Sequence, residues 1–255
     1  MPARSEYPTG LWLRLRAHSK VLLGTLRAIA LFAVLLLVGH WALYAPTHGS
    51  VNAHEQHTLR AAIKYLVCAY LTFMLLETAW RLGLKSSLAI IKSITPLVVL
   101  QNVGILALVG AAGVGLYFAF PVLQWSWLYL LAGSSGGARA MNVALLPVTV
   151  EYFGLVFLVL FGLTVPYFAR AEEMRFRLGT KDWRDGALRS IGFGLSHCWM
   201  GIPIAWGMAL TIGGLWFTYQ YFKGGVGRST MHHTAYNLIV VVCLFVGVAY
   251  STFAG

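Results

Sequence analysis

Three short motifs in the second half of the sequence bring together side chains that could do chemistry. They are Glu172-Glu173 with Arg177, Phe193 with His197, and His233 with Asn237. Residues four apart share one face of an α-helix, so each motif presents two side chains together. A glutamate and a histidine can hold and deprotonate a water, while a histidine beside an asparagine can stabilise an oxyanion. These residue types can hydrolyse an amide without a serine or cysteine nucleophile.

The first motif directs its two glutamates differently. Adjacent residues on a helix point about 100° apart, so Glu172 and Glu173 cannot share one role. Glu173 can reach Arg177 one turn later, and this pairing leaves Glu172 to point into a helix bundle. The same geometry argues against a nucleophilic pair between His197 and the neighbouring Cys198. The expected nucleophile is therefore a water.

The composition is that of a membrane protein. Of the 255 residues, 58% are hydrophobic and only 11% are charged, and the mean hydropathy is +0.72. Soluble domains carry about 25% charged residues, so this chain has too little polar surface for a soluble globule. We predict an all-α, polytopic membrane helix bundle of about six to eight transmembrane helices, each of about 20 residues. The net charge of +11 is interpreted as positively charged cytoplasmic loops, and no nucleic-acid partner is expected.

Charged segments divide the sequence into three parts of one integrated membrane domain. Residues 1–27 form a basic cytoplasmic segment, residues 28–168 hold the N-terminal transmembrane helices, and residues 169–255 hold the motif-bearing C-terminal helices. We expect an integral protein of the inner or plasma membrane with its N-terminus in the cytoplasm, because a basic flank precedes the first span. The expected spans are residues 28–44, 61–80, 96–120, 142–168, 187–200, 204–222 and 232–253, with a helix break at Gly201 and Pro203.

Other expectations concern what lies around the motifs. Lys223 and Arg228 are predicted to occupy a glycine-rich cytoplasmic loop, and His232 is predicted to face the lipid headgroups. With this topology the four candidate catalytic side chains meet in the cytoplasmic half of the bundle. Small residues let helices approach closely. Those expected to do so in the span at residues 96–120 are Gly104, Gly110, Gly113 and Gly115.

The three motifs, in this order, resemble those of the CPBP family, the CAAX-protease and bacteriocin-processing intramembrane peptidases. The family pattern is EExxxR, then FxxxH, then HxxxN, and all seven positions match in this chain. The resemblance covers the chain from residue 168 onward. One departure is Leu178, where the family's first motif usually has a glycine after the arginine.

The resemblance implies an all-α bundle whose catalytic cavity opens toward the cytosolic leaflet. It implies an endopeptidase in which Glu172 and His197 activate the water. His233 and Asn237 then form the oxyanion site. The residues that it assigns to supporting roles, bracing the first motif and packing the second, are Glu173, Arg177 and Phe193.

Two mechanisms remain open for such a site. Activity in the family has been ascribed either to a metal or to a glutamate-activated water. Glu172, His197 and His233 could bind zinc with one position open. We favour no cofactor, because Asn237 is a poor zinc ligand and a good oxyanion donor.

Other functions remain alternatives. One is a non-catalytic CPBP-fold subunit, structural or for assembly, of a larger membrane complex. It is favoured by the tryptophans outside the motifs, which include Trp41, Trp80, Trp125 and Trp127. A transporter is a third interpretation, without an inverted repeat to support it. The ionisable residues that could mark its pathway are Lys64, Glu77 and Glu151. The expected partners are membrane lipids with a membrane-protein or peptide substrate, or else a larger membrane complex.

Overall fold

The computed structural model describes residues 70–78, 84–127 and 151–253, with side chains from residue 154 in the last range. The chain divides into two compact units, residues 1–67 and 68–255, and all described residues belong to the second. About 90% of the described residues are helical, and they contain no strand. The prediction of an all-α protein is confirmed for this part of the chain.

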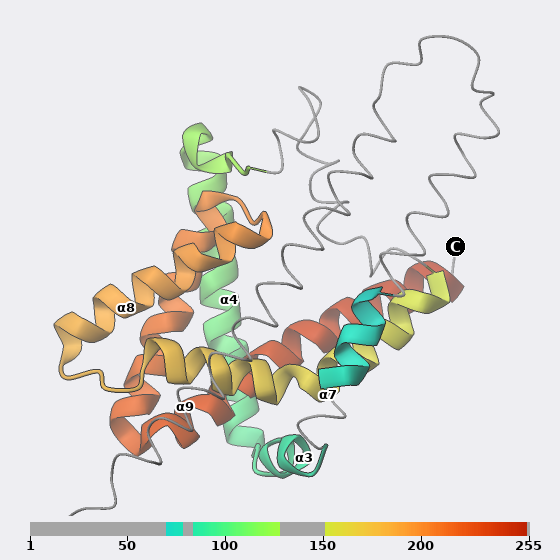
Figure 1. The fold of residues 1–255 in the computed structure, drawn as a ribbon. Helices are drawn as coiled ribbons and strands as arrows, with labels where there is room; N and C mark the ends of the chain where they lie inside the picture. The colour runs from blue at the N-terminus through green and yellow to red at the C-terminus, as the bar shows by residue number, and fades with distance from the viewer. Residues whose placement is uncertain (1–69, 79–83, 128–150, 254–255) are drawn as a thin grey trace, which may run out of the picture. The chain divides into compact units, whose positions relative to one another are not determined.

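One long helix, α9, is the common partner of the others. The helices α4, α7 and α8 each pack mainly against it, and α7 runs beside its second half (Figure 1). Residues 70–78 are also helical. The elements in chain order are α3 (Leu84–Lys92), α4 (Pro96–Ala119), η1 (Pro121–Gln124), α7 (Glu151–Phe176), α8 (Trp183–Ser196), η2 (His197–Met200) and α9 (Ile204–Phe253).

Local sequence signals fix the ends of the helices that carry the motifs. The Asp182 side chain accepts a hydrogen bond from the Asp185 backbone N–H at the start of α8, which satisfies a donor that the helix cannot. After η2, Gly201 adopts a left-handed conformation with φ of 85°, and Pro203 directly precedes α9. The predicted break at Gly201 and Pro203 is therefore present, because glycine tolerates this conformation and proline cannot continue a helix.

The helix α9 consists of two segments joined at a sharp break. Its 50 residues include Gly224 (φ −168°, ψ 26°) and Gly225 (φ 67°, ψ −167°), neither of which is helical. A straight helix of this length would measure about 75 Å, far more than a bilayer core of about 30 Å. The loop predicted around Lys223 and Arg228 is shorter than expected. The chain turns within two glycines, and Arg228 already lies in the second helical segment.

The described part of the chain contains fewer spans than predicted. Three helices are long and apolar enough to cross a membrane, at Pro96–Ala119, Gly154–Phe176 and Ile204–Phe253. The first agrees with the expected span at residues 96–120, and α7 continues past the expected end at residue 168. The segment expected as a span at residues 187–200 forms α8 and η2, neither of which is long enough to cross a membrane. The span at 28–44 and most of that at 61–80 lie outside the described residues.

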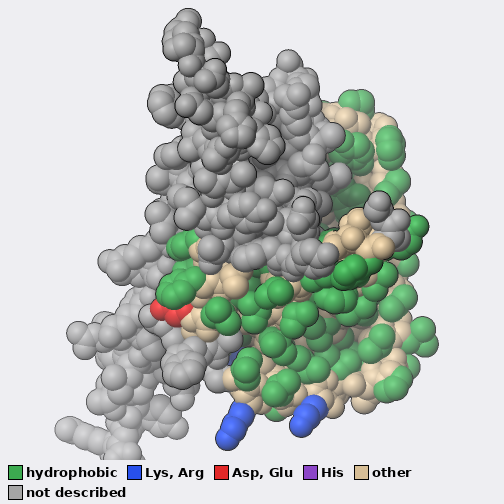
Figure 2. Space-filling model, turned by 90° about the vertical axis from the view of Figure 1, so that its right-hand side faces the viewer, with side chains coloured by type: hydrophobic (Ala, Val, Ile, Leu, Met, Phe, Trp, Pro, Cys, Tyr) green, Lys and Arg blue, Asp and Glu red, His purple; other side chains and the backbone are tan. Residues whose placement is uncertain are grey.

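The outer surface agrees with a membrane protein. Hydrophobic side chains cover most of the described face in Figure 2, and lysine or arginine side chains stand at its lower edge. Exposed apolar side chains occur along every long helix, for example Phe118, Val156 and Tyr250. An apolar surface of this extent is unfavourable in water and favourable in lipid.

Small residues join α8 to the first half of α9. A methyl group on Gly194 would overlap the carbonyl oxygen of Gly207, and one on Gly214 would lie 3.0 Å from the Ser190 side chain. Gly186, one turn before Ser190, approaches Thr218 in the same way. The backbones therefore lie nearly in contact, as small residues every fourth position permit in membrane helices.

The glycines of α4 behave differently from the prediction. Of the four α4 glycines, Gly113 alone has a close neighbour among the described residues, the indole of Trp206. A side chain at any of the other three would meet no described atom within 4 Å. On α4 this close approach to a described residue occurs at Gly113, whereas on α8 it occurs at both Gly186 and Gly194. The three predicted contact positions without a neighbour are Gly104, Gly110 and Gly115.

Candidate functional site

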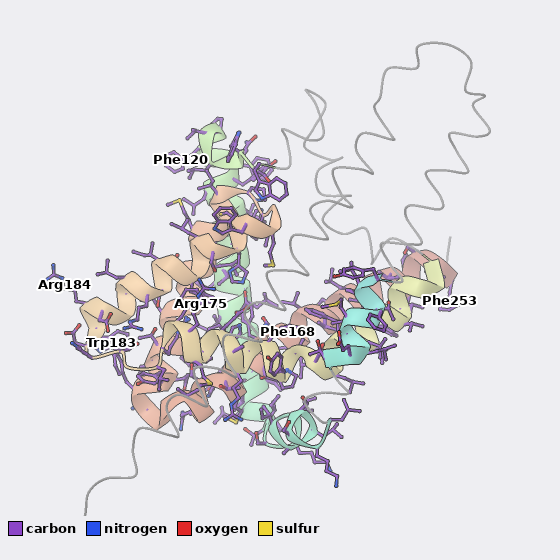
Figure 3. All side chains as sticks on the ribbon, viewed as in Figure 1. Phe120, Phe168, Arg175, Trp183, Arg184 and Phe253 are labelled. Carbon is purple, nitrogen blue, oxygen red and sulfur yellow. The ribbon has the colours of Figure 1, made fainter. Side chains whose placement is uncertain are left out.

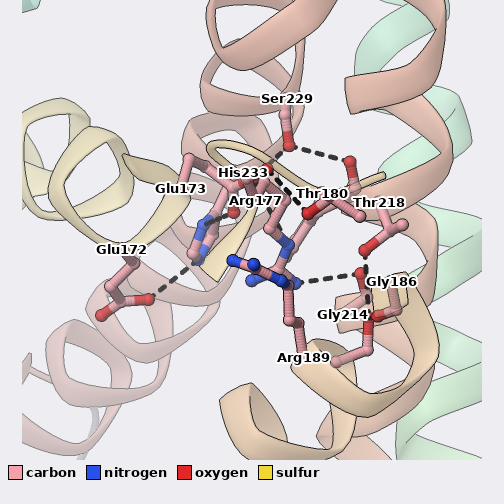
Figure 4. A network of polar contacts seen from close by, with 12 residues as sticks. Glu172, Glu173, Arg177, Thr180, Gly186, Arg189, Gly214, Thr218, Ser229 and His233 are labelled. Carbon is pink, nitrogen blue, oxygen red and sulfur yellow. Dashed lines mark hydrogen bonds and ion pairs between the residues drawn. The ribbon is translucent and has the colours of Figure 1, made fainter. Parts of the chain in front are cut away.

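A buried carboxylate near the end of α7 organises the site. Glu173 is completely buried. Its Oε1 accepts a hydrogen bond from Nδ1 of His233 at 2.9 Å, and the Ser229 hydroxyl bonds its Oε2. Ser229 also lies 2.8 Å from the carbonyl oxygen of Phe217. These contacts tie α7 to both segments of α9 (Figure 4).

The guanidinium of Arg177 balances this carboxylate. Its Nε lies 3.6 Å from Oε2 of Glu173, and both side chains are completely buried. The predicted contact at one helical turn is present, as a single ion pair rather than a bidentate one. A second nitrogen, Nη2, donates to the Gly214 carbonyl oxygen at 2.9 Å. The ring of Phe193 lies 4.5 Å from the guanidinium carbon, so the charge is packed between a carboxylate, a carbonyl and an aromatic face.

His233 lies between two carboxylates. Nδ1 of His233 donates a hydrogen bond to Glu173, and Nε2 of His233 lies 3.5 Å from Oε2 of Glu172. The imidazole stacks on the ring of Phe217 with 4.3 Å between centroids, and Phe193 contacts it edge-on. These contacts hold the imidazole plane in place, so the direction of Nε2 is set by residues on three helices.

The prediction that Glu172 points into the bundle is wrong, because Glu173 is the buried glutamate. Glu173 is the inward residue, whereas the Glu172 side chain is 37% exposed. Glu173 shares a helix face with Arg177, and that face of α7 is the one turned toward α9. Glu172, about 100° around the helix, therefore reaches His233 from the edge of the bundle. Of the two carboxylates on His233, Glu172 is the one open to water or substrate.

His197 lies where α8 becomes η2, and it shares an aromatic neighbour with His233. The ring of Phe193 contacts His197 with centroids 4.8 Å apart and also contacts His233. Nδ1 of His197 lies 2.9 Å from the Phe193 carbonyl oxygen. A carbonyl oxygen can only accept, so Nδ1 carries a proton and a neutral His197 has its lone pair on Nε2. In this tautomer Nε2 of the half-buried imidazole is the atom that can accept a proton.

Asn237 lies one turn after His233 on α9 and is half-buried. Its amide makes no hydrogen bond to any residue that the structure describes. The structure therefore brings Glu172 and His233 into contact, and leaves His197 and Asn237 near them without direct contact. The four side chains do not all touch one another.

The candidate zinc ligands are not assembled. The described residues contain no group of three or more histidine, cysteine, aspartate or glutamate side chains placed to hold a metal ion. The Phe193 ring contacts both His197 and His233, and among the described residues no direct contact joins the two imidazoles. Glu172, His197 and His233 in this arrangement do not fit a zinc site, and we derive no step through a metal.

A second polar cluster lies on the other side of α9. Asn102 of α4 is completely buried. Its Nδ2 donates to Nδ1 of His232 at 3.2 Å, and its Oδ1 accepts from the indole N–H of Trp216 at 3.2 Å. His232 is 1% exposed, so the prediction that it faces the headgroups is wrong. The sequence signal for this cluster was Asn102 within an apolar span, because a polar group buried in a membrane needs a hydrogen-bond partner.

Ser229 contacts Glu173 in the site but belongs to none of the three sequence motifs. It lies one turn before His233 and is completely buried. A serine four residues before a histidine, beside the break at Gly225, gives no distinctive signal in the sequence. Its role depends on Glu173, which is 56 residues away along the chain.

The turn between α7 and α8 has its own polar contacts. Asp185 accepts a hydrogen bond from Nε of Arg189 at 2.8 Å and one from the Lys181 backbone N–H at 3.1 Å. The bond from Arg189, followed by that from Lys181, lowers the pKa of Asp185 below its ordinary value. The carboxylate form is therefore favoured in the folded protein.

Comparison with models of known protein families, with curated proteins and with solved structures finds no match to this chain. The resemblance to the CPBP family thus rests on the seven motif residues of the sequence alone.

Proposed function

We propose that this protein is an intramembrane endopeptidase of the CPBP type, which hydrolyses a peptide bond with a glutamate-activated water. One observation carries the proposal: buried His233 is held between Glu173, which is inaccessible, and Glu172, which is open to the edge of the bundle. Such an imidazole has one nitrogen fixed by a buried partner and the other directed at a reachable carboxylate. This is an arrangement for proton transfer at Glu172.

The buried residues act as positioning groups in this proposal. Glu173 orients His233 through Nδ1, and Arg177 offsets the negative charge of Glu173. Ser229 restrains the second oxygen of the carboxylate. Because all three are buried, they keep Nε2 of His233 directed at Glu172 without touching the substrate themselves.

The residues at the edge carry the chemistry. Glu172 takes the proton from the attacking water, and the Nε2 lone pair of His197 orients the same water by accepting a hydrogen bond from it, without taking a proton. The Asn237 amide supplies a donor to the oxyanion that forms on the substrate carbonyl, and His233, whose Nδ1–H is already bonded to Glu173, joins it through Nε2 in its doubly protonated form. The final proton transfer goes from Glu172 to the leaving amine, which restores the carboxylate.

The surroundings of the site fit a substrate that approaches from the membrane. The motif-bearing helices α7 and α9 are long and apolar enough to span a bilayer. We propose an integral protein of the inner or plasma membrane with a cytoplasmic N-terminus, whose substrate is a membrane-bound protein or peptide cleaved near the cytoplasmic surface. No cofactor is needed for this mechanism.

A second candidate function has a specific observation in its favour. Large aromatic side chains are exposed at the end of the bundle formed by η1 and η2. Trp199 is 84% exposed, and the indole N–H of Trp127 donates to the backbone carbonyls of Cys198 and Trp199. Such a surface can bind another membrane protein. The alternative is a non-catalytic CPBP-fold subunit of a larger complex, in which the Glu173 network only stabilises the fold.

The experiment compares the wild-type chain with Glu172→Gln in membranes of a host that lacks the native gene. New protein N-termini in the membrane fraction are mapped by mass spectrometry. The proposal expects N-termini that require the wild-type chain and disappear in Glu172→Gln. Asp182→Asn is the matched control, since it also removes one carboxylate while asparagine still caps the helix. Identical N-termini with and without Glu172 would favour the structural subunit.

A further inference from the structure

The turn between α7 and α8 lies against the break in α9. The Gly179 backbone N–H donates to the hydroxyl of Tyr221 at 3.2 Å. The ring of Trp183 contacts the rings of Phe222 and Tyr219, with centroids 5.1 Å and 6.5 Å apart. All three rings are partly exposed, and Trp183 is 53% exposed. Aromatic side chains from two segments thus form one exposed surface at this end of the bundle.

Three exposed cations accompany these rings, one in contact with a ring and two beside Trp183 in the sequence. Lys223 holds its ammonium nitrogen 5.3 Å from the centre of the Tyr219 ring. Arg184 follows Trp183 at the start of α8 (Figure 3), and Lys181 precedes it in the turn; all three cations are exposed. We call this surface the aromatic–basic platform. It consists of Trp183, Tyr219, Phe222, Lys181, Arg184 and Lys223.

The nearby carboxylates do not neutralise the platform. Asp182 bonds the backbone N–H of Asp185, and Asp185 forms an ion pair with Arg189. Glu172 and Glu173 are directed at His233. Within the described part of the chain, Lys181, Arg184 and Lys223 form no ion pair with an acidic side chain. Lys181 is attracted to the Asp185 carboxylate without an ion pair, whereas the charges of Arg184 and Lys223 have no such partner among the described residues, and the platform keeps a net positive charge for an external anion.

We propose that the aromatic–basic platform binds the headgroup of an anionic phospholipid. The rings of Trp and Tyr prefer the boundary between headgroups and acyl chains. Lysine and arginine beside an anionic leaflet gain about 1 kcal/mol each, or about fivefold in affinity. The platform combines both on a chain whose long helices are membrane-spanning in length and composition. A lipid phosphate contacts the three cations, and the glycerol region packs on the rings.

This inference does not depend on peptide hydrolysis, because none of the six platform residues belongs to the proposed catalytic site. It also differs from a general attraction of basic loops to anionic membranes. A general attraction is proportional to the number of charges wherever they lie, whereas the platform requires the lysines that stand beside the rings. Two pairs of lysines distinguish these cases, Lys181 with Lys223 on the platform and Lys85 with Lys92 on α3.

The test uses the full chain in dodecyl maltoside micelles with equal amounts of phosphatidylglycerol and phosphatidylcholine. Native mass spectrometry counts each lipid bound to the protein. The wild-type chain should bind phosphatidylglycerol in preference to phosphatidylcholine. Lys181→Gln/Lys223→Gln should lower this preference by about fivefold per lysine. Lys85→Gln/Lys92→Gln, with the same change in charge, should leave it within twofold of wild type, which is about half a kcal/mol.

Further arms make the outcome decisive. Lys181→Arg/Lys223→Arg keeps the charge and should keep the preference, which excludes a folding defect as the cause. Inorganic phosphate in tenfold excess should not displace the lipid, because it lacks the apolar part that packs on the rings. Equal losses in the two glutamine pairs, an unchanged preference in Lys181→Gln/Lys223→Gln, or displacement by inorganic phosphate would each overturn the proposal.

Discussion

Two adjacent histidines of α9, His232 and His233, lie in opposite surroundings. His233 contacts two carboxylates and two aromatic rings, and one of the carboxylates is partly exposed. His232 contacts the neutral amide of Asn102 and the edge of an indole, and no carboxylate of the described residues forms an ion pair with it. Both are buried to nearly the same degree. Burial alone therefore does not separate a candidate catalytic histidine from a structural one.

The difference lies in what the partner can do with a proton. Asn102 already donates to His232 and accepts from Trp216, so this cluster is a fixed set of neutral hydrogen bonds. It joins α4 to the segments of α9 on both sides of the break. Glu173 and Glu172 give His233 partners that can exchange protons. In the proposed function the His232 cluster stabilises the fold, whereas the His233 cluster takes part in the reaction.

Arg177→Ala should produce the largest loss of stability. It leaves the carboxylate of Glu173 buried without its cation, which typically costs about 3–5 kcal/mol. The free energy of unfolding in mixed micelles measures this loss. Arg189→Ala is the matched control, because Arg189 makes an ion pair of the same spacing with Asp185 at the partly exposed start of α8. Its loss should stay below about 1 kcal/mol, and equal losses in the two variants would show that the buried pair has no special role.

Gly194→Ala should be the next most destabilising change. The new methyl group would overlap the Gly207 carbonyl oxygen and the Thr211 backbone, which pushes α8, and with it Phe193, away from α9. Overpacking of this kind costs about 1–3 kcal/mol. Gly110→Ala, on α4, has no described atom within 4 Å of the added carbon and should be neutral or stabilising. Thermal unfolding compares the pair, and a loss in Gly110→Ala as large as in Gly194→Ala would contradict the assigned helix contacts.

Asn102→Ala tests the structural side of the comparison. The change leaves the indole N–H of Trp216 and Nδ1 of His232 without their partner, at a cost of about 1–3 kcal/mol. Stability should fall, while the rate of peptide cleavage by the protein that remains folded should stay near wild type. A selective loss of cleavage in fully folded Asn102→Ala would move His232 into the catalytic site.

The smallest expected effect concerns pH and Asp185. Its folded-state pKa lies below the ordinary value of 3.8 because of Arg189 and the Lys181 backbone N–H. A lowered pKa means that the carboxylate contributes stability above pH 3.8, and that this contribution is lost as the pH falls through the folded value. Asp185→Asn should therefore remove a small part of the acid dependence of unfolding as the pH falls below 3.8. An identical acid dependence in wild type and variant would contradict the assignment.

The structural features that could be predicted from the sequence are those that depend on residues close together along the chain. The break at Gly201 and Pro203 follows from backbone chemistry, and the contact between Glu173 and Arg177 follows from helical spacing. The sharp turn at Gly225 was expected as a longer loop. Two glycines do not reveal from sequence alone whether the following residues are helical, since packing against α7 decides this.

Contacts between distant segments could not be predicted in the same way. The bond between Asn102 and His232 joins residues 130 apart, and that between Glu173 and Ser229 joins residues 56 apart. Each depends on which helix faces are in contact. The inward direction of Glu173 has the same origin, because the motif fixes the angle between the two glutamates but not which of them is turned toward α9.

The central claim is that Glu172 is a base held ready by buried residues around His233. Its most direct test is the first-order rate constant for cleavage of a substrate by purified Glu172→Gln in proteoliposomes, relative to wild type. General acid–base catalysis contributes about two to four orders of magnitude, so the rate should fall by that factor. Folding should be unchanged, because glutamine has the same shape at this partly exposed position. A rate within threefold of wild type in a fully folded Glu172→Gln variant would contradict the claim.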